Sequence, residues 1–184
     1  MISSIPNEML ASLAIIIFGG IAAVVRWRRG QLGYAGLETQ LRDLVAEETG
    51  AIPATEQVGE AFVRAAVNDA LPDDDPDWLT LDGSYFAPEG GDIDQLRDVS
   101  SAPQWLPYRE ERYDCEDFAF SFQALAALIG GVNTVGVVID WSDSHAYNVI
   151  VDANGGVVFY EPQDDHPIRI GSDGYAADDV TVVF

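Results

Sequence analysis

The sequence predicts an α+β domain behind one N-terminal membrane helix. Three observations lead to this prediction. An uncharged stretch, Met9–Val25, stops at a cluster of arginines. Apolar residues at helical spacing follow it, and β-branched segments separated by turn residues fill the last third of the chain. We therefore expect an anchor over residues 1–29, a linker over 30–36 and a folded domain over 37–184.

The charge balance is extreme for a chain of this length. The 184 residues include 31 acidic and 9 basic side chains, for a net charge of -22, and none of the basic residues is lysine. A cationic face for nucleic acid is therefore not expected. Repulsion of this size opposes folding unless salt screens it, so the composition resembles that of haloarchaea and their viruses. An ordinary acidic domain would explain the charge but not the missing lysine.

The segment Met9–Val25 is long enough to approach the width of a bilayer, at about 26 Å for 1.5 Å per residue. Trp27 and the arginines around it suit the interface. A buried core helix is the first alternative, but the segment is not amphipathic. A cleaved signal peptide is the second, but Glu8 is the only charge before it. The arginines predict a single-pass protein in a host-cell or virion membrane, with its C-terminal domain in the cytoplasm.

Helices are expected to dominate the first half of the domain. Leu37–Glu47 has the apolar spacing of one helix, and Thr55 can cap a second that ends near Pro72. Trp78–Pro107 has no sustained period, which predicts a long ordered loop containing one short helix near Asp92–Val99.

The second half predicts one long helix and then an antiparallel sheet. Cys115–Ile129 forms the helix, closed by Gly130 and Gly131, with acidic residues in its first turn. An Asn-Gly turn at Asp152–Gly156 joins two of the strands. The expected strands are Val135–Trp141, His145–Val151 and Val157–Glu161, with possible edge strands at Ile168–Ile170 and Val180–Phe184.

Three residues of this second half form a candidate chemical site. Cys115 begins the helix, where the helix dipole helps to stabilise a thiolate. His145 begins a strand and can accept the thiol proton, and Glu161 ends the neighbouring strand and can orient the imidazole. Asn148 is the alternative orienting residue, although strand alternation points it to the face opposite His145. The carboxylates of Asp114, Glu116 and Asp117 oppose ionisation of the thiol, so reactivity would depend on His145 and on salt.

The segment Asp114-Cys-Glu-Asp-Phe-Ala119 resembles the nucleophile helix of papain-like and transglutaminase-like cysteine peptidases. His145-Ala-Tyr-Asn148 and Glu161-Pro-Gln163 are similar, more particularly, to the C-terminal papain-like protease domain of the Marasmius mushroom agglutinin. The resemblance spans about Trp105 to Gln163. It implies a papain-like fold, with Cys115 as nucleophile, His145 as base and acid, and Glu161 as orienting residue. It also implies a peptide or protein substrate.

The remaining parts of such a site are less defined. The backbone N–H of Cys115 can be one oxyanion donor, and Gln104 or Trp105 can supply a second contact. One cysteine and two histidines are too few for a soft-metal site. No cofactor is required by this chemistry, and calcium is possible because the related protease depends on it, with ligands that the sequence does not assign.

Two functions from different classes are therefore compatible with the sequence. The first is a membrane-tethered, halophilic cysteine peptidase or related acyl-transfer enzyme that works through a thioester. The second is a non-catalytic, membrane-associated structural or interaction protein that keeps the same fold, for instance in a haloarchaeal virus.

Overall fold

A computed structural model describes residues 36, 39, 40, 43, 54–72, 75–90, 93–100, 107–172 and 174–184. The chain divides into two compact units, Met1–Ile52 and Pro53–Phe184. Every helix and strand named below belongs to the second unit. The predicted bounds of anchor, linker and domain stay predictions. The predicted membrane segment Met9–Val25 and most of the predicted helix Leu37–Glu47 lie outside the described residues.

A six-stranded sheet forms the centre of the second unit. Its spatial order is β2-β8-β4-β5-β6-β7. All neighbouring strands are antiparallel except β2 and β8, which run parallel. The strands are β2 Asp77–Leu79, β4 Val135–Asp140, β5 His145–Val151, β6 Val157–Glu161, β7 His166–Ile168 and β8 Val180–Val183.

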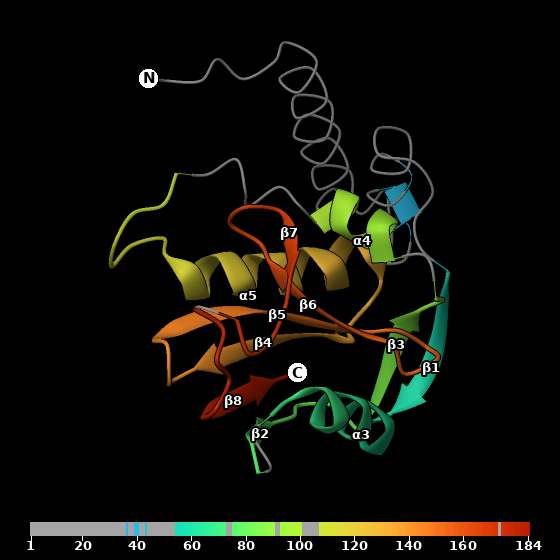
Figure 1. Cartoon of the computed structure of the whole chain (residues 1–184). Helices are drawn as coiled ribbons and strands as arrows, with labels where there is room; N and C mark the ends of the chain where they lie inside the picture. Colours follow the sequence, from blue (N-terminus) through green and yellow to red (C-terminus); the bar gives the residue numbers. More distant parts are fainter. Residues whose placement is uncertain are drawn as a thin grey trace. The chain divides into compact units, whose positions relative to one another are not determined.

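Helices cover both faces of this sheet, as Figure 1 shows. On one face α5, Cys115–Leu125, lies against β4 and β5, and α4, Ile93–Ser100, contacts α5. On the other face α3, Glu60–Ala70, contacts β5 and β6. A separate two-stranded ribbon pairs β1, Thr55–Gly59, with β3, Ser84–Pro88.

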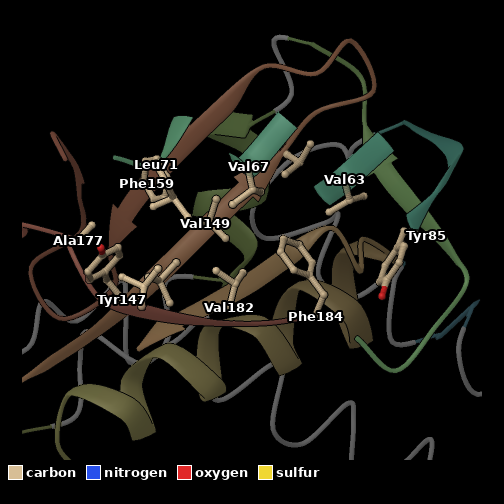
Figure 2. Packing of buried hydrophobic residues seen from close by; sticks show 13 residues of the cluster. Val63, Val67, Leu71, Tyr85, Tyr147, Val149, Phe159, Ala177, Val182 and Phe184 are labelled. Carbon is tan, nitrogen blue, oxygen red and sulfur yellow. The ribbon is translucent and has the colours of Figure 1, made fainter. Parts of the chain in front are cut away.

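The main apolar core lies between α3 and the sheet (Figure 2). Burying such side chains contributes roughly 1.5–3 kcal/mol each, so this layer supplies much of the folding free energy. The sheet contributes side chains of alternate residues, as expected for one face of a strand. The buried members labelled in the figure are Val63, Val67, Leu71, Tyr85, Tyr147, Val149, Phe159, Ala177, Val182 and Phe184.

The start of α5 is fixed by its flanking carboxylates. Asp114 takes the N-cap position with extended backbone, and it forms a capping box with Asp117. In the box the backbone N–H of Asp114 donates to the Asp117 carboxylate at 3.4 Å. At its other end α5 widens into a π-helical turn, Ala126–Gly130, and Gly131 stops it in the left-handed conformation at φ 67°. Cys115 is thereby held as the first residue of the helix.

Asn148 fastens α5 to the sheet beneath it. Its buried side-chain amide donates to the carbonyl of Ala119 at 2.9 Å and to the carbonyl of Gly136 at 3.0 Å. Because one side chain bridges the helix and two strands, the position of Cys115 above β5 is set by a polar contact as well as by packing.

The structure confirms the main predicted elements of the second half and one of the first. The helix beginning at Cys115, the three long strands and the short helix near 92–99 are all present, with ends displaced by a few residues. The expected helix from Thr55 was wrong in its first turn, because Thr55–Gly59 is a strand and the helix begins at Glu60. The expected long loop also contains β2 and β3. These short strands form by pairing with distant partners, which local periodicity does not reveal.

Candidate thiol site

A pocket of about 340 Å³ opens between the start of α5 and the loop joining β4 to β5. Cys115 and His145, which the sequence places 30 residues apart, both line it. Much of the remaining wall is apolar or aromatic. The full lining consists of Cys115, Glu116, Phe120, Ile139, Asp140, Trp141, Ser144, His145 and Ala146.

His145 and Glu161 form a close polar contact at the site. Nε2 of His145 lies 2.7 Å from Oε2 of Glu161, and the two side chains are 23% and 3% exposed. Strand register explains the contact: β5 and β6 pair Asn148 with Tyr160, so Glu161 lies diagonally across from His145 on the same face. The buried carboxylate thus fixes the orientation of the imidazole through Nε2, and Nδ1 is the ring nitrogen that does not contact Glu161.

Glu161 is held by more than His145. Its Oε1 accepts the backbone N–H of Gln163 at 3.0 Å, and its Oε2 accepts the hydroxyl of Tyr175 at 3.1 Å. Burial alone would raise the pKa of Glu161, but the hydrogen bonds from His145, Gln163 and Tyr175 outweigh it and lower the pKa below its ordinary value. Glu161 is therefore an ionised carboxylate at neutral pH.

The pKa of Cys115 is shifted in the opposite direction, above its ordinary value. Burial raises the pKa of its thiol, and so does the adjacent Glu116, whose Oε2 lies 3.4 Å from the sulfur. The backbone of Ala146, the residue after His145, partly offsets this increase. The resting state is consequently a neutral thiol that donates to Glu116, as the acidic flank of the sequence predicts.

The loop before His145 is shaped by one buried carboxylate. Asp140 accepts the backbone N–H groups of Ser142 at 3.1 Å, Asp143 at 3.3 Å and Ala177 at 2.9 Å, and it also accepts the Ser142 hydroxyl. Ser144 then adopts a left-handed φ of 53°, which is uncommon for a residue with a side chain. This turn delivers His145 to the pocket.

The structure thus brings Cys115, His145 and Glu161 to one end of the sheet. Asn148 lies elsewhere, bound to Ala119 and Gly136, and Glu161 is the partner of the imidazole. Gln104 and Trp105 lie outside the described residues. Sequence reasoning did not identify Tyr175 or Asp140. Tyr175 is 14 residues from its partner Glu161, in a segment without periodicity that carries no local signal.

Comparison with known families identifies the chain. Residues 67–177, more than half of the sequence, match the family described as the ricin-type beta-trefoil lectin C-terminal domain. The chain belongs to this family. The matched range contains every residue of the site just described, from Cys115 to Tyr175. Among curated proteins, no sequence matches significantly.

Two solved structures resemble this member of the lectin C-terminal domain family. The PSL1a–E64 complex is 25% identical, with a TM-score of 0.54, and the alignment covers 70% of this chain and 51% of that one. Polyporus squamosus lectin bound to the human-type influenza-binding epitope Neu5Acα2-6Galβ1-4GlcNAc is 26% identical, with a TM-score of 0.53 and coverage of 70% and 49%. The chain therefore spans about half the length of these neighbours.

These findings correct the predicted family and fold. The papain-like and transglutaminase-like assignment is replaced by the lectin C-terminal domain family, a β-rich domain with eight strands in the part of the chain that the structure describes. The short motif around Cys115 misled the assignment because it specifies an acidic helix N-terminus, a local feature that does not define a fold.

The predicted activity, partner and location are corrected with them. Neither comparison supports a membrane-tethered cysteine peptidase, a hydrolase or a peptide substrate, because the matching family and a matching structure are lectins by description. The single-pass membrane location is likewise not retained for a lectin-family domain. Over the described part of the chain no helix has the length and apolarity to cross a bilayer, and Met9–Val25 falls outside that part.

Calcium dependence stays a prediction. Within the described residues no group of three or more acidic, histidine or cysteine side chains is placed to hold a metal ion. Asp140, the most buried carboxylate of the pocket wall, already accepts hydrogen bonds from its own loop and from Ala177.

Proposed function

We propose that this lectin-family domain binds ligands in the pocket between α5 and the β4–β5 loop, and that Cys115 is a reactive thiol there. In this proposal His145 is the base and Glu161 holds it in orientation. The observation that carries the proposal is the 2.7 Å contact between His145 and the buried Glu161, at a pocket that Cys115 also lines. A histidine oriented in this way is suited to take a proton from a thiol.

The chemistry proposed for the site is addition of the thiol to an electrophilic ligand. Because Nε2 of His145 is engaged by Glu161, Nδ1 would take the proton from Cys115. With an epoxide, the thiolate forms a C–S bond to one ring carbon while the C–O bond breaks. The oxygen receives the electron pair and then the proton from His145, so the sum is one thiol added across one epoxide.

The solved complex of the neighbour PSL1a with E64 supports the choice of this ligand chemistry, since E64 is a thiol-directed epoxide. The resting hydrogen bond from Cys115 to Glu116 must break before the thiol can react. For each reagent, the rate at Cys115 can be divided by the rate of the same reagent with a free thiol in solution. We therefore expect this ratio to be larger for a ligand that fills the pocket than for a small reagent.

The test is the second-order rate of labelling at Cys115, measured by intact mass with E64 and with iodoacetamide. Cys115 is the only cysteine, so the mass increase is assigned to it without digestion. We expect His145→Ala and Glu161→Gln to lower the E64 rate about tenfold or more, as removal of a positioned base typically does. His166→Ala is the matched control, because His166 is the other histidine of the chain and is exposed on β7. Equal rates for wild type, His145→Ala and denatured protein would refute the proposal.

Carbohydrate contact at the same pocket is the second function we propose, and Trp141 favours it. The indole is 58% exposed and lines the pocket, yet it is fixed by a hydrogen bond from Nε1 to the Thr181 hydroxyl at 3.0 Å. A rigid, exposed tryptophan offers a flat surface to the apolar face of a sugar ring. The trisaccharide bound to Polyporus squamosus lectin supports testing this ligand class here.

Tryptophan fluorescence provides that test. Titration with Neu5Acα2-6Galβ1-4GlcNAc should change the emission of wild type, and Trp141→Ala should abolish the saturable change. Trp78→Phe is the matched control because Trp78 lies on β2 and stacks on Phe184, away from the pocket. A saturable change that survives in Trp141→Ala would place the carbohydrate elsewhere.

A further inference from the structure

The segment that follows β7 contributes Tyr175 to the site, a residue that belongs to no recognisable sequence motif. The Tyr175 hydroxyl donates to Oε2 of Glu161 at 3.1 Å, and this is the same oxygen that contacts Nε2 of His145. The ring of Tyr175 also meets the His145 ring edge-on, with centroids 5.5 Å apart. One side chain therefore touches both members of the histidine–carboxylate pair.

We propose that Tyr175 is a positioning residue that aligns Glu161 with His145 and thereby sets the reactivity of Cys115. The proposal rests on the thiol function proposed above. Tyr175 would act through the other two residues and not on the ligand. The Tyr175 hydroxyl restricts the Glu161 carboxylate to the rotamer that faces the imidazole. The Tyr175 ring shields one side of the imidazole from solvent.

The backbone next to Tyr175 is anchored in a way that suits this role. The N–H of Ala176 donates to the Asp143 carboxylate at 2.6 Å, and the N–H of Ala177 donates to Asp140 at 2.9 Å. Ala177 is fully buried and has a left-handed φ of 56°, a conformation that surrounding contacts must enforce. These bonds join the segment to the turn that precedes His145, so Tyr175 is positioned from the same turn as the histidine.

The surrounding charges keep Tyr175 a hydrogen-bond donor. Burial and the negative charge of Glu161 both raise the pKa of the phenol, and the nearby Asp164 adds to this increase. The groups that face Glu161 are His145 from β5, Gln163 from its own turn and Tyr175 from the C-terminal segment. The Tyr147 ring lies 5.5 Å from that of Tyr175 and its pKa is also raised, chiefly by burial, so it brings no negative charge at neutral pH.

Tyr175→Phe tests the proposal because it removes the hydroxyl and keeps the ring. We expect the E64 labelling rate at pH 7 to fall about three- to tenfold, the range that one net hydrogen bond predicts. We also expect the pKa of Glu161, followed by ¹³C NMR of its carboxyl carbon, to rise because a donor is lost. Tyr85→Phe is the matched control, since Tyr85 packs in the core against Phe184.

The two measurements separate this inference from the thiol function. If wild type labels no faster than His145→Ala, the thiol function fails and with it the effect of Tyr175 on Cys115, but a raised pKa of Glu161 in Tyr175→Phe would still support the alignment of Glu161 by Tyr175. If wild type labels rapidly and Tyr175→Phe matches it in both rate and Glu161 pKa, the role of Tyr175 is overturned. A lower thermal midpoint with an unchanged Glu161 pKa would show a structural role only and would also overturn it.

Discussion

The sulfur of Cys115 donates its hydrogen bond to Glu116, with 3.4 Å between Sγ and Oε2. The residue that follows the thiol in sequence is thus its partner in the resting state, and a neighbouring anion disfavours a thiolate. Glu116 therefore acts as a restraint on the reactivity of Cys115, and removing its charge should reveal how strong that restraint is.

Glu116→Gln should make Cys115 react faster at a fixed pH. The substitution removes the negative charge that raises the pKa of the thiol and replaces the carboxylate acceptor by a neutral amide, while burial continues to raise the pKa. The expected increase is about two- to tenfold, in line with one charge-assisted hydrogen bond. Iodoacetamide labelling between pH 7 and 10 measures it, and Glu110→Gln controls for the change in net charge. A slower Glu116→Gln variant would contradict the assigned role.

Glu161 should make folding stability depend on pH in the acid range. Its pKa is lowered in the folded state from the ordinary value of 4.5, so the unfolded chain binds the proton more readily. The contribution of Glu161 is therefore present above pH 4.5 and is lost as the pH falls through the lowered folded-state pKa. Urea denaturation of wild type and Glu161→Gln at several pH values isolates the contribution of Glu161 to the free energy of unfolding. The difference in their unfolding free energy should shrink as the pH falls below 4.5, and a constant difference would count against the linkage.

Asn148→Ala should destabilise the fold by about 2–4 kcal/mol, because it leaves buried carbonyls without their donor and creates a small cavity. The two carbonyls are those of Ala119 on α5 and Gly136 on β4. Chemical denaturation measures the loss. Asn154→Ala, in the turn between β5 and β6, is the control and should change stability by less than about 0.5 kcal/mol. Similar losses in the two variants would argue against the bridging role of Asn148.

Gly136→Ala should be costly although alanine has the higher strand propensity. A Cβ at this position would lie 2.6 Å from Cε2 of Phe184, which is buried against Trp78 and Tyr85. Overpacking of this kind costs roughly 1–3 kcal/mol. Phe184→Leu should therefore rescue Gly136→Ala in a double-mutant cycle measured by thermal unfolding. Strictly additive effects would show that the two residues do not compete for the same space.

Salt should stabilise the domain strongly. The net charge is -22, and raising KCl from about 0.1 M to about 1 M shortens the Debye length from roughly 10 Å to roughly 3 Å. We expect the thermal midpoint to rise over this range and to level off at higher concentrations. Calorimetry in KCl, with sucrose as an uncharged co-solute for comparison, would detect this rise in the thermal midpoint. A midpoint that does not respond to KCl would show that repulsion among the acidic residues has little effect on the stability of the fold.

The parts of the fold that sequence could predict are those with a local cause. The helix at Cys115 follows from its acidic first turn and its closing glycines, and the hairpin follows from β-branched strands around an Asn-Gly turn. The strand Thr55–Gly59 has no such cause. Its side chains are largely exposed, and it exists because β3 lies beside it.

The candidate site likewise contains residues that the sequence could predict and one that it could not. Cys115, His145 and Glu161 were predicted from their places at element ends, and the hairpin brings the last two within 2.7 Å. Tyr175 could not be predicted, because its position depends on hydrogen bonds from the next two residues to Asp140 and Asp143. The family was mistaken for a similar reason: a short motif records local chemistry, whereas membership depends on a match over more than half of the chain.

The register of the β5–β6 hairpin has one more consequence. Side chains alternate between the faces of a strand, so a slip of one residue between β5 and β6 would turn Glu161 away from His145. A mispaired hairpin could therefore keep its backbone hydrogen bonds and still lose the charged pair. Reactivity at Cys115 would then report during refolding whether the hairpin has formed in its native alignment, which spectroscopic strand content alone would not distinguish.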